Sequence, residues 1–283
     1  MTDVEGGNVD PAFNDVREFY NASPFNMGAS AADHAARLAK HDPLQTYPPL
    51  VQILQPGMRV LEVGCGVGWL SNSAALHHGC DVVGIDFSTP AVARAREISR
   101  ELGTKASFEV ADLFQWQAPT PFDAVVSVGV LMHTRDCIGA LRRLSQDFVK
   151  PGGYLFIGLY HSFGRKAFLD HFAKLRAQGL SEDELFREYS HLHPLEDGVL
   201  LRSWFRDQVL VPHETQHSLA ELAPVLAEES LELVSTSLNR FERFSALEEL
   251  FSIEREYEAL GYERLKAGRY FPGFFVFLAR KAP

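Results

Sequence analysis

Short, nearly continuous apolar runs alternate with helical stretches through the middle of the chain, and this rhythm restricts the fold more than any other feature. The runs lack the alternation of a half-exposed strand, so they predict strands buried on both faces of a parallel sheet. Parallel neighbours need crossover helices between them, which gives a doubly wound α/β sheet. The predicted strands are Arg59–Gly64, Asp81–Asp86, Ser107–Leu113, Phe122–Val130 and Tyr154–Tyr160.

Glycine and proline mark the ends of the helices between these strands. Gly79 and Gly103 fall where a residue in the left-handed conformation ends a helix. Thr89 is placed to cap a helix that has Pro90 at its first position. The expected helices run from the end of the first strand to about His78, over Ala91–Leu102 and over Arg135–Phe148.

The flanks of this region predict helical additions. We expect residues 1–57 to form an N-terminal helical segment or lid, and residues 58–283 to form the core. Residues 161–217 contain no clear strand and are expected to form a cap inserted into that core. Two late strands would extend the sheet at one edge. The remaining predicted elements are helices Pro11–Tyr20, Ala31–His41, Pro49–Gln55 and Leu247–Lys266, and strands Leu231–Arg240 and Phe274–Arg280.

Acidic residues outnumber basic ones, which bears on the partners of the chain. The 283 residues include 37 Asp and Glu against 27 Lys and Arg, a formal net charge of −10. The densest basic segment, Ala91–Arg100, is an ordinary solvated helix face, so nucleic-acid binding is not expected. The longest apolar runs are strand-sized and fall short of the ~20 residues that span a bilayer, so no membrane partner is expected.

The cysteines and the first residues bear on the compartment. Cys65, Cys80 and Cys137 are odd in number and form no C-x-x-C pair, so neither a disulfide framework nor a zinc ribbon is predicted. The start of the chain, MTDVEGGNVDP, is acidic and lacks the apolar segment of a signal peptide. We therefore expect a soluble, cytoplasmic protein. The sequence leaves its oligomeric state open.

The first predicted strand runs into a glycine-rich turn that opens a helix. Glycines there let backbone N–H groups approach a ligand that a Cβ would block. A dinucleotide fingerprint would need G-x-G-x-x-G. Its third position would fall on Trp69 or Ser71, so the pyrophosphate-binding form is absent. The segment reads Val60-Leu-Glu62-Val-Gly64-Cys65-Gly66-Val-Gly68-Trp-Leu.

Acidic residues end the next two strands in the order that a nucleoside ligand needs. Asp86, 18 residues after Gly68, is placed to accept both ribose hydroxyls. Asp112 is placed to accept the adenine amino group while the backbone N–H of Leu113 meets the ring, and Phe87 to pack on the adenine face. Each acid alone is also explained as a strand-end cap. Together, in this order, they indicate an adenosyl nucleoside.

These pieces resemble the class I S-adenosylmethionine (SAM)-dependent methyltransferases. The resemblance implies a seven-stranded sheet with its last strand antiparallel, and SAM as cofactor. Because SAM has no pyrophosphate, the missing third glycine is not required. Glu62 offers negative charge near the methionine end of SAM, and Tyr20 is a candidate for the early aromatic residue that closes on it in many relatives. The matching segments, between Val60 and Leu159, are LEVGCGVGWLS, VVGIDFS, VADLF, FDAVVSVGVLMHT and KPGGYLFIGLY. The predicted cofactor contacts are Tyr20, Glu62, Gly64, Cys65, Gly66, Gly68, Asp86, Phe87, Asp112 and Leu113.

Three residues follow the fourth and fifth strands, where a general base is needed if the acceptor is a hydroxyl or an ammonium. His133 lies at a position where similar methyltransferases of the quinone-biosynthesis type often carry a histidine. It is interpreted as a substrate contact or base, or alternatively as a loop histidine bonded to backbone. Tyr160 and His161 are expected to point at the same crevice, and one of them to contact substrate. The predicted catalytic residues are His133, Tyr160 and His161.

The segment from Arg202 to His217 is rich in polar and aromatic side chains for a loop, which favours binding over packing. The alternative is a cap whose polar groups satisfy one another. Residues 213–217 also spell H-E-x-x-H, a zinc-protease motif that requires a helix. Pro212 precedes the motif and a capping box at Ser218 starts a helix after it. We therefore predict no metal. The predicted substrate contacts are Trp204, Asp207, His213 and His217.

The predicted function is methyl transfer from SAM to an O, N, S or C atom of a small molecule. Other uses of the same cofactor stay open: intramolecular cyclisation of SAM, lipid methylation, or SAM binding without catalysis. Methylation of nucleic acid or protein conflicts with the acidic charge. The resemblance does not fix the acceptor, because acceptor sites of these enzymes lie in variable caps and loops.

Overall fold

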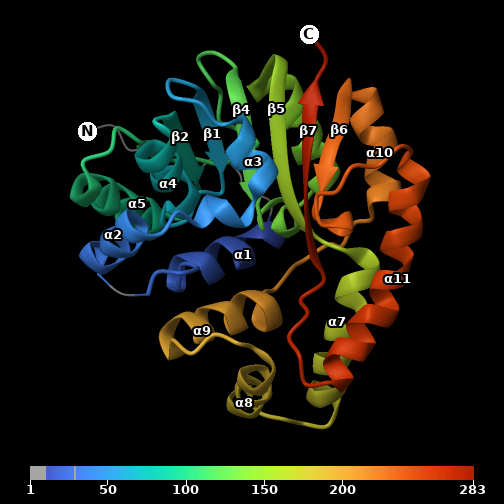
Figure 1. Cartoon of the computed structure of the whole chain (residues 1–283). Coiled ribbons are helices and arrows are strands. Elements are labelled where there is room, and N and C mark those ends of the chain that lie inside the picture. Colours follow the sequence, from blue (N-terminus) through green and yellow to red (C-terminus); the bar gives the residue numbers. More distant parts are fainter. Residues whose placement is uncertain (1–10, 29) are drawn as a thin grey trace.

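Seven strands form one sheet in the order β3-β2-β1-β4-β5-β7-β6 (Figure 1). β7 runs antiparallel to both of its neighbours, and the other pairs are parallel. The computed structural model describes residues 11–28 and 30–283, so the prediction about the acidic start of the chain lies mostly outside it. The strands are β1 Arg59–Val63, β2 Asp81–Asp86, β3 Ser107–Val110, β4 Phe122–Val128, β5 Val149–Tyr160, β6 Leu231–Thr236 and β7 Phe274–Lys281. The predicted doubly wound sheet with an antiparallel last strand is confirmed.

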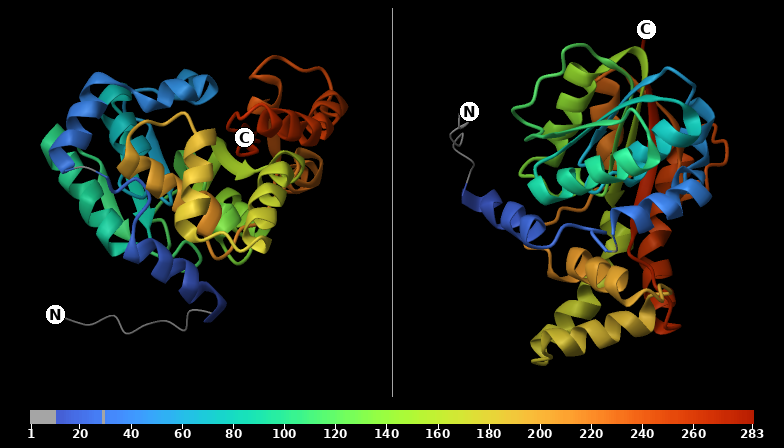
Figure 2. Two further views of the ribbon diagram at one scale, coloured as in Figure 1. Left: turned by 90° about the horizontal axis from the view of Figure 1, so that it is seen from below. Right: turned by 90° about the vertical axis from the view of Figure 1, so that its left-hand side faces the viewer.

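Helices cover both faces of the sheet, precede it and extend below the carboxyl ends of its parallel strands (Figures 1 and 2). A π-helical turn, Leu144–Phe148, follows α6, and a second, Arg206–Leu210, follows α9. The helices are α1 Pro11–Ala22, α2 Ala31–Lys40, α3 Pro48–Ile53, α4 Trp69–His78, α5 Thr89–Leu102, α6 Cys137–Arg143, α7 Ser162–Ala177, α8 Glu182–Leu192, α9 Gly198–Phe205, α10 Leu219–Glu228 and α11 Leu247–Lys266.

Some strands end before their apolar runs do. β3 ends at Val110 rather than at Leu113 because Asp112 turns the chain, and its Oδ1 accepts the N–H of Phe114 at 2.8 Å. The predicted Leu231–Arg240 strand ends at Thr236, because Ser237–Asn239 form a 3₁₀ turn whose first residues are capped by the hydroxyl of Thr236, which accepts the N–H of Leu238. Polar side chains that bond to nearby backbone compete with strand pairing at these points.

The predicted helix punctuation is right at two glycines and displaced by one residue at a third site. Gly79 and Gly103 end α4 and α5 with φ of +66° and +67°. Ser88, not Thr89, precedes α5, and its N–H donates to Oδ1 of Asp86 at 2.8 Å. The carboxylate that ends β2 therefore also fixes the start of the next helix.

Alternate residues of the central strands go to opposite faces of the sheet. Leu61 and Val125 belong to a core that contains residues of α6 and α10. Val60 and Val126 pack on the other face with residues of α3 and α4. Each such buried side chain contributes about 1.5–3 kcal/mol relative to an exposed one, so both layers stabilise the sheet.

The carboxyl ends of the parallel strands face a set of helices rather than open solvent. In Figure 1, α1 lies just below these ends and α9 lies below α1, while α7 packs along α11. The cap has its own core, in which Phe168 and Phe172 of α7 meet Tyr189 and Phe205. The predicted helical additions, one from the N-terminus and one after the fifth strand, are therefore confirmed. None of the helices described has the length and apolar character needed to cross a membrane.

Candidate functional site

The turn after β1 leaves open space in front of its backbone. Gly66 has a φ of +51°, and a Cβ built there would meet no atom within 4 Å. At Gly64 a Cβ would lie 2.2 Å from the side chain of Val130, so that position excludes any larger residue. Cys65 is buried with its side chain in the core, so only its backbone is available to a ligand. This geometry fits a polar ligand group lying against the chain.

Asp86 ends β2 beside this turn and is held by backbone donors. Its Oδ2 accepts the N–H of Gly66 at 2.9 Å, and its Oδ1 accepts the N–H of Ser88. Burial raises the pKa of this carboxyl. Each oxygen keeps a lone pair for a further donor, so the carboxylate is positioned to accept ribose hydroxyls. Phe87 follows it, with its ring 6.2 Å from that of Tyr20.

Asp112 lies after the end of the neighbouring strand β3, so the two predicted nucleoside-binding acids both lie at the carboxyl ends of the parallel strands. One oxygen of Asp112 accepts the N–H of Phe114, and the other has no hydrogen-bond partner among the described residues. The side chain of Leu113 is buried in the core. The proposed contacts of Asp112 and of the Leu113 backbone with a base stay predictions.

Glu62 is engaged at the start of α4, which Gly68 precedes with a φ of +80°. Its Oε2 accepts the N–H of Ser71 at 2.8 Å and the hydroxyl of the same residue. Burial raises the pKa of Glu62 to about 8. The expected contact of Glu62 with the methionine end of a cofactor stays a prediction.

Tyr20 of α1 lies close to residues that follow both β2 and β4. Its hydroxyl donates to Oδ1 of Asp207 at 2.7 Å, and its ring lies 6.2 Å from those of Phe87 and of His133. Burial, followed by the charge of Asp207, raises the pKa of Tyr20 well above its usual value, so it stays a donor. Burial also raises the pKa of the Asp207 carboxyl. An aromatic side chain of the N-terminal segment thus lies between the tips of β2 and β4 and is held by the cap.

His133 has a defined tautomer. It is 5% exposed, and its Nδ1 lies 2.8 Å from the carbonyl oxygen of His213. A carbonyl only accepts, so Nδ1 carries the proton and Nε2 of the neutral ring holds a lone pair. Nε2 is buried and has no hydrogen-bond partner among the described residues. The backbone bond, which is the alternative to a catalytic role, is therefore present, and the role of His133 as a base or substrate contact stays a prediction.

Tyr160 and Arg165 form the wall next to His133. The ring of Tyr160 lies 5.9 Å from the His133 ring, and the Arg165 guanidinium lies 3.7 Å from the Tyr160 centroid. Arg165 is fully buried and makes a bidentate pair with Glu214, at 3.0 and 2.7 Å. Sequence reasoning missed this arginine. The available signal was its helical spacing of three residues from Phe168, on the face of α7 that builds the cap core.

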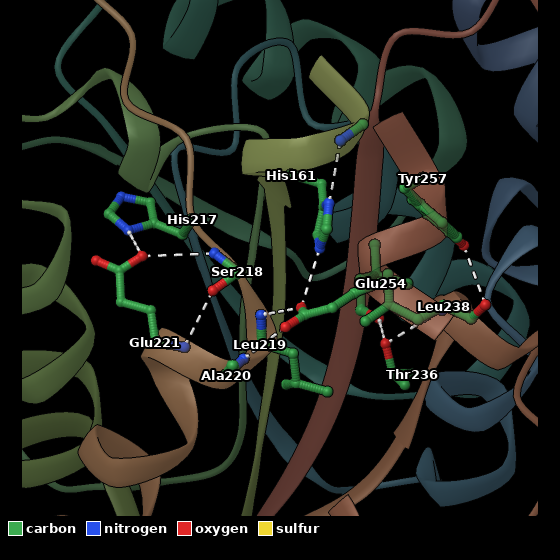
Figure 3. A network of polar contacts seen from close by, with 12 residues as sticks. His161, His217, Ser218, Leu219, Ala220, Glu221, Thr236, Leu238, Glu254 and Tyr257 are labelled. Carbon is green, nitrogen blue, oxygen red and sulfur yellow. Dashed lines mark hydrogen bonds and ion pairs between the residues drawn. The ribbon is translucent and has the colours of Figure 1, made fainter. Parts of the chain in front are cut away.

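His161 does not point at the crevice that Tyr160 lines, and this expectation was wrong. Figure 3 shows its ring between α7 and α11: Nδ1 accepts the N–H of Gly164, and Nε2 lies 3.1 Å from Oε2 of Glu254. Glu254 also accepts the N–H groups of Leu219 and Ala220 at the start of α10. Successive residues of a strand point to opposite faces, so one of the pair had to turn away.

His217 is also engaged within the protein. Its Nε2 lies 2.9 Å from the hydroxyl of Thr215, and its Nδ1 lies 3.2 Å from Oε2 of Glu221 (Figure 3). Its backbone N–H donates to the carbonyl of Tyr160. The structure thus gives His217 an anchoring role, whereas the backbone carbonyl of His213 orients the ring of His133.

The remaining cap residues tie the cap to the N-terminal segment. Nε1 of Trp204 donates to Oδ1 of Asn26 at 3.0 Å, and the N–H of Asn26 donates to the hydroxyl of Ser203. Residues 213–217 form no helix, as predicted, and Glu214 of this segment pairs with Arg165. No group of three or more metal-binding side chains occurs in the part of the chain that the structure describes.

Comparisons with known proteins agree with this geometry. A family model for a methyltransferase domain matches residues 54–192. Phosphoethanolamine N-methyltransferase 3 of Arabidopsis thaliana is 37% identical over 108 residues, which are 38% of this chain and 22% of that protein. Ubiquinone biosynthesis O-methyltransferase of Ralstonia nicotianae is 35% identical over 138 residues, 48% of this chain and 55% of that protein. The chain therefore matches about half or less of the length of these curated relatives.

A solved structure extends the likeness to the whole fold. Magnesium protoporphyrin IX methyltransferase from Synechocystis PCC 6803, crystallised with SAM, has a TM-score of 0.55. The alignment covers 98% of this chain and 100% of that one at 15% sequence identity. At that identity the likeness shows the fold.

Proposed function

We propose that this chain, residues 54–192 of which belong to the methyltransferase-domain family, transfers a methyl group from SAM to a small molecule. The observation that carries the proposal is the order in which functional groups occur at the carboxyl ends of the parallel strands. The glycine turn, Asp86 and Asp112 lie at the carboxyl ends of the adjacent strands β1, β2 and β3, and His133 and Tyr160 lie at the carboxyl ends of β4 and β5. A nucleoside subsite thus lies directly beside a subsite with a base, at the crevice where open α/β sheets bind ligands.

The residues present fit SAM. Asp86 would hold the ribose hydroxyls, Asp112 the adenine amino group, and the turn at Gly66 the methionine part, where a Cβ would occupy the open space. When bound, the cofactor supplies a methyl group already activated on a cationic sulfur. The protein's tasks are then to orient the acceptor, to exclude water and to accept a proton.

Each of these tasks has a residue of this chain. Nε2 of His133 accepts the proton of a hydroxyl or ammonium acceptor, because its Nδ1–H is fixed by a carbonyl. Tyr20, bonded to Asp207, covers the site from α1 and excludes water. Trp204 and Asp207 contact the acceptor from the cap. We accordingly propose that residues 1–57 act as a lid and residues 161–217 as an acceptor-binding cap.

The product of SAM consumption tests the proposal. The full chain is incubated with methyl-labelled SAM and a deproteinised metabolite extract of the source cells. We expect label in an extract compound together with S-adenosylhomocysteine, in amounts that depend on the extract. Methylthioadenosine as product would instead indicate cyclisation of SAM, and tight SAM binding without any turnover would indicate a binding module.

The compartment is part of the proposal. All three cysteines are buried and free. Free thiols fit a reducing compartment, so we propose that the protein works on metabolites in the cytoplasm.

A further inference from the structure

We call the part of the site formed by His133, Tyr160 and Asp207 the acceptor side. Its carboxylate, Asp207, forms no ion pair with a basic residue in the part of the chain that the structure describes. Asp207 is partly buried, and its one hydrogen bond to a described residue comes from the neutral hydroxyl of Tyr20. The charged or titratable groups around it are His133, Arg165 and Glu214, together with four tyrosines, Tyr20, Tyr160, Tyr189 and Tyr270. The second carboxylate oxygen of Asp207 accepts no bond from any described residue.

The nearby cation, Arg165, already has an ion-pair partner and hydrogen-bond acceptors within the protein. Its guanidinium donates to both carboxylate oxygens of Glu214 and to the carbonyls of Gln208 and Pro272. Its Cζ atom also lies 3.7 Å from the ring centroid of Tyr160 and 4.4 Å from that of Phe168. A buried pair of this geometry is electrically neutral, and separating it to bind another anion would leave a carboxylate buried alone.

The next basic residue, Arg206, is directed to the lid rather than to Asp207. Its guanidinium lies 4.7 Å from the centroid of Phe19, on α1, and its Nε is buried without a hydrogen-bond partner among the described residues. The acceptor side therefore combines one carboxylate, one internally neutralised pair and the imidazole of His133. Its remaining polar groups are the hydroxyls of Tyr20 and Tyr160.

We infer that the acceptor is a neutral or positively charged molecule that donates a hydrogen bond to Asp207, and that it carries no net negative charge. This inference rests on the proposed function. An anionic acceptor, such as a phosphate ester, would have to leave water for a site in which Arg165, the cation that acts on Asp207, is already paired with Glu214 and in which Asp207 adds a like charge, which is costly. A hydroxyl or ammonium donor gains a charge-assisted bond from the same carboxylate.

Fractionation of the metabolite extract tests the inference. The extract is passed over a strong anion exchanger at pH 8, and each fraction is incubated with the full chain and methyl-labelled SAM. We expect the label in the compounds that flow through, which are neutral or cationic. Label confined to compounds that the resin retains would overturn the inference while leaving methyl transfer established. No label in any fraction, with SAM still bound, would contradict the proposed function itself.

Two matched variants, assayed with the acceptor that becomes labelled, then test whether Asp207 is the residue that binds it. Asp207→Asn keeps the shape but removes the charge, and kcat/KM for the acceptor should fall about tenfold or more, with unchanged affinity for S-adenosylhomocysteine. Arg206→Gln, which removes the neighbouring positive charge, should change kcat/KM less than about twofold. A loss of acceptor affinity in Arg206→Gln, with Asp207→Asn unaffected, would indicate an anionic acceptor and overturn the inference.

Discussion

The two sides of the site are built in different ways. On the nucleoside side, at the tips of β1, β2 and β3, the bonds are local: Asp86 bonds to Gly66 and Ser88, which are 20 and 2 residues away. On the acceptor side the bonds join distant segments: Tyr20 and Asp207 are 187 residues apart. Local backbone bonds can be kept by many sequences, whereas distant side-chain pairs belong to one cap. From this difference we expect that cofactor binding and acceptor choice can change independently of each other in this fold.

Removing the base should give the largest effect and should affect only the acceptor side. We expect His133→Ala to lower kcat by about 10²- to 10⁴-fold, because Nε2 of His133 would no longer accept the acceptor's proton. Turnover is measured with labelled SAM and the acceptor that the fractionated extract provides. Affinity for S-adenosylhomocysteine, measured by calorimetry, should stay nearly unchanged.

The control for this variant is His191→Ala, which alters an exposed histidine of α8. It should leave both quantities unchanged. If His133→Ala weakened S-adenosylhomocysteine binding as strongly as it lowered turnover, the two sides would not be separable, and the comparison above would fail.

Breaking the buried pair should cost the cap most of its stability. In Arg165→Met the Glu214 carboxylate stays buried without its partner, so we expect the free energy of unfolding to fall by about 3–5 kcal/mol. Urea unfolding measures this change. Lys166→Met, which removes the exposed partner of Asp170 one residue along α7, is the matched control and should have little effect. Equal losses in the two variants would mean that the pair does not hold the cap.

The nucleoside side is tested through Asp86. We expect Asp86→Ala to weaken SAM binding by about 10- to 100-fold, because the ribose hydroxyls lose a charged acceptor. Calorimetry with SAM measures the affinity, and circular dichroism checks that the fold persists. Asp81→Ala, at the exposed start of the same strand, is the control. Unchanged affinity in Asp86→Ala would remove the nucleoside assignment.

The contrast between the two sides also explains what the sequence could predict. The buried strands, the glycine turn and Asp86 were predictable because each depends on a pattern within a few residues. The pairing of Arg165 with Glu214 was not, since the two residues lie 49 positions apart and the H-E-x-x-H motif that contains Glu214 does not predict an arginine partner. His161 was misplaced for a simpler reason: the alternation of side chains along a strand directs it to the face opposite Tyr160.

The smallest predicted effect is a dependence of the stability of the cap on pH. His193, at the end of α8, accepts the N–H of Leu195 with Nδ1, and its Nε2 is buried without a hydrogen-bond partner among the described residues. Burial lowers the pKa of His193 to about 4. The unfolded chain, with a histidine pKa of about 6.5, therefore binds this proton more readily than the folded cap does. Stability must then fall as the pH drops below about 6.5, and the loss ends near pH 4.

Because the ring of His193 is only half buried, we expect a loss of about 1 kcal/mol between pH 7 and pH 5, after allowance for solvent screening. His193→Gln should remove this slope, so the measurement is urea unfolding of both proteins at the two pH values. Carboxyls whose pKa burial raises, such as Asp86 and Asp207, contribute the opposite slope, but equally in both proteins. The difference between the proteins thus isolates the cap. An identical pH dependence would show that the proton of His193 does not distinguish the folded cap from the unfolded chain.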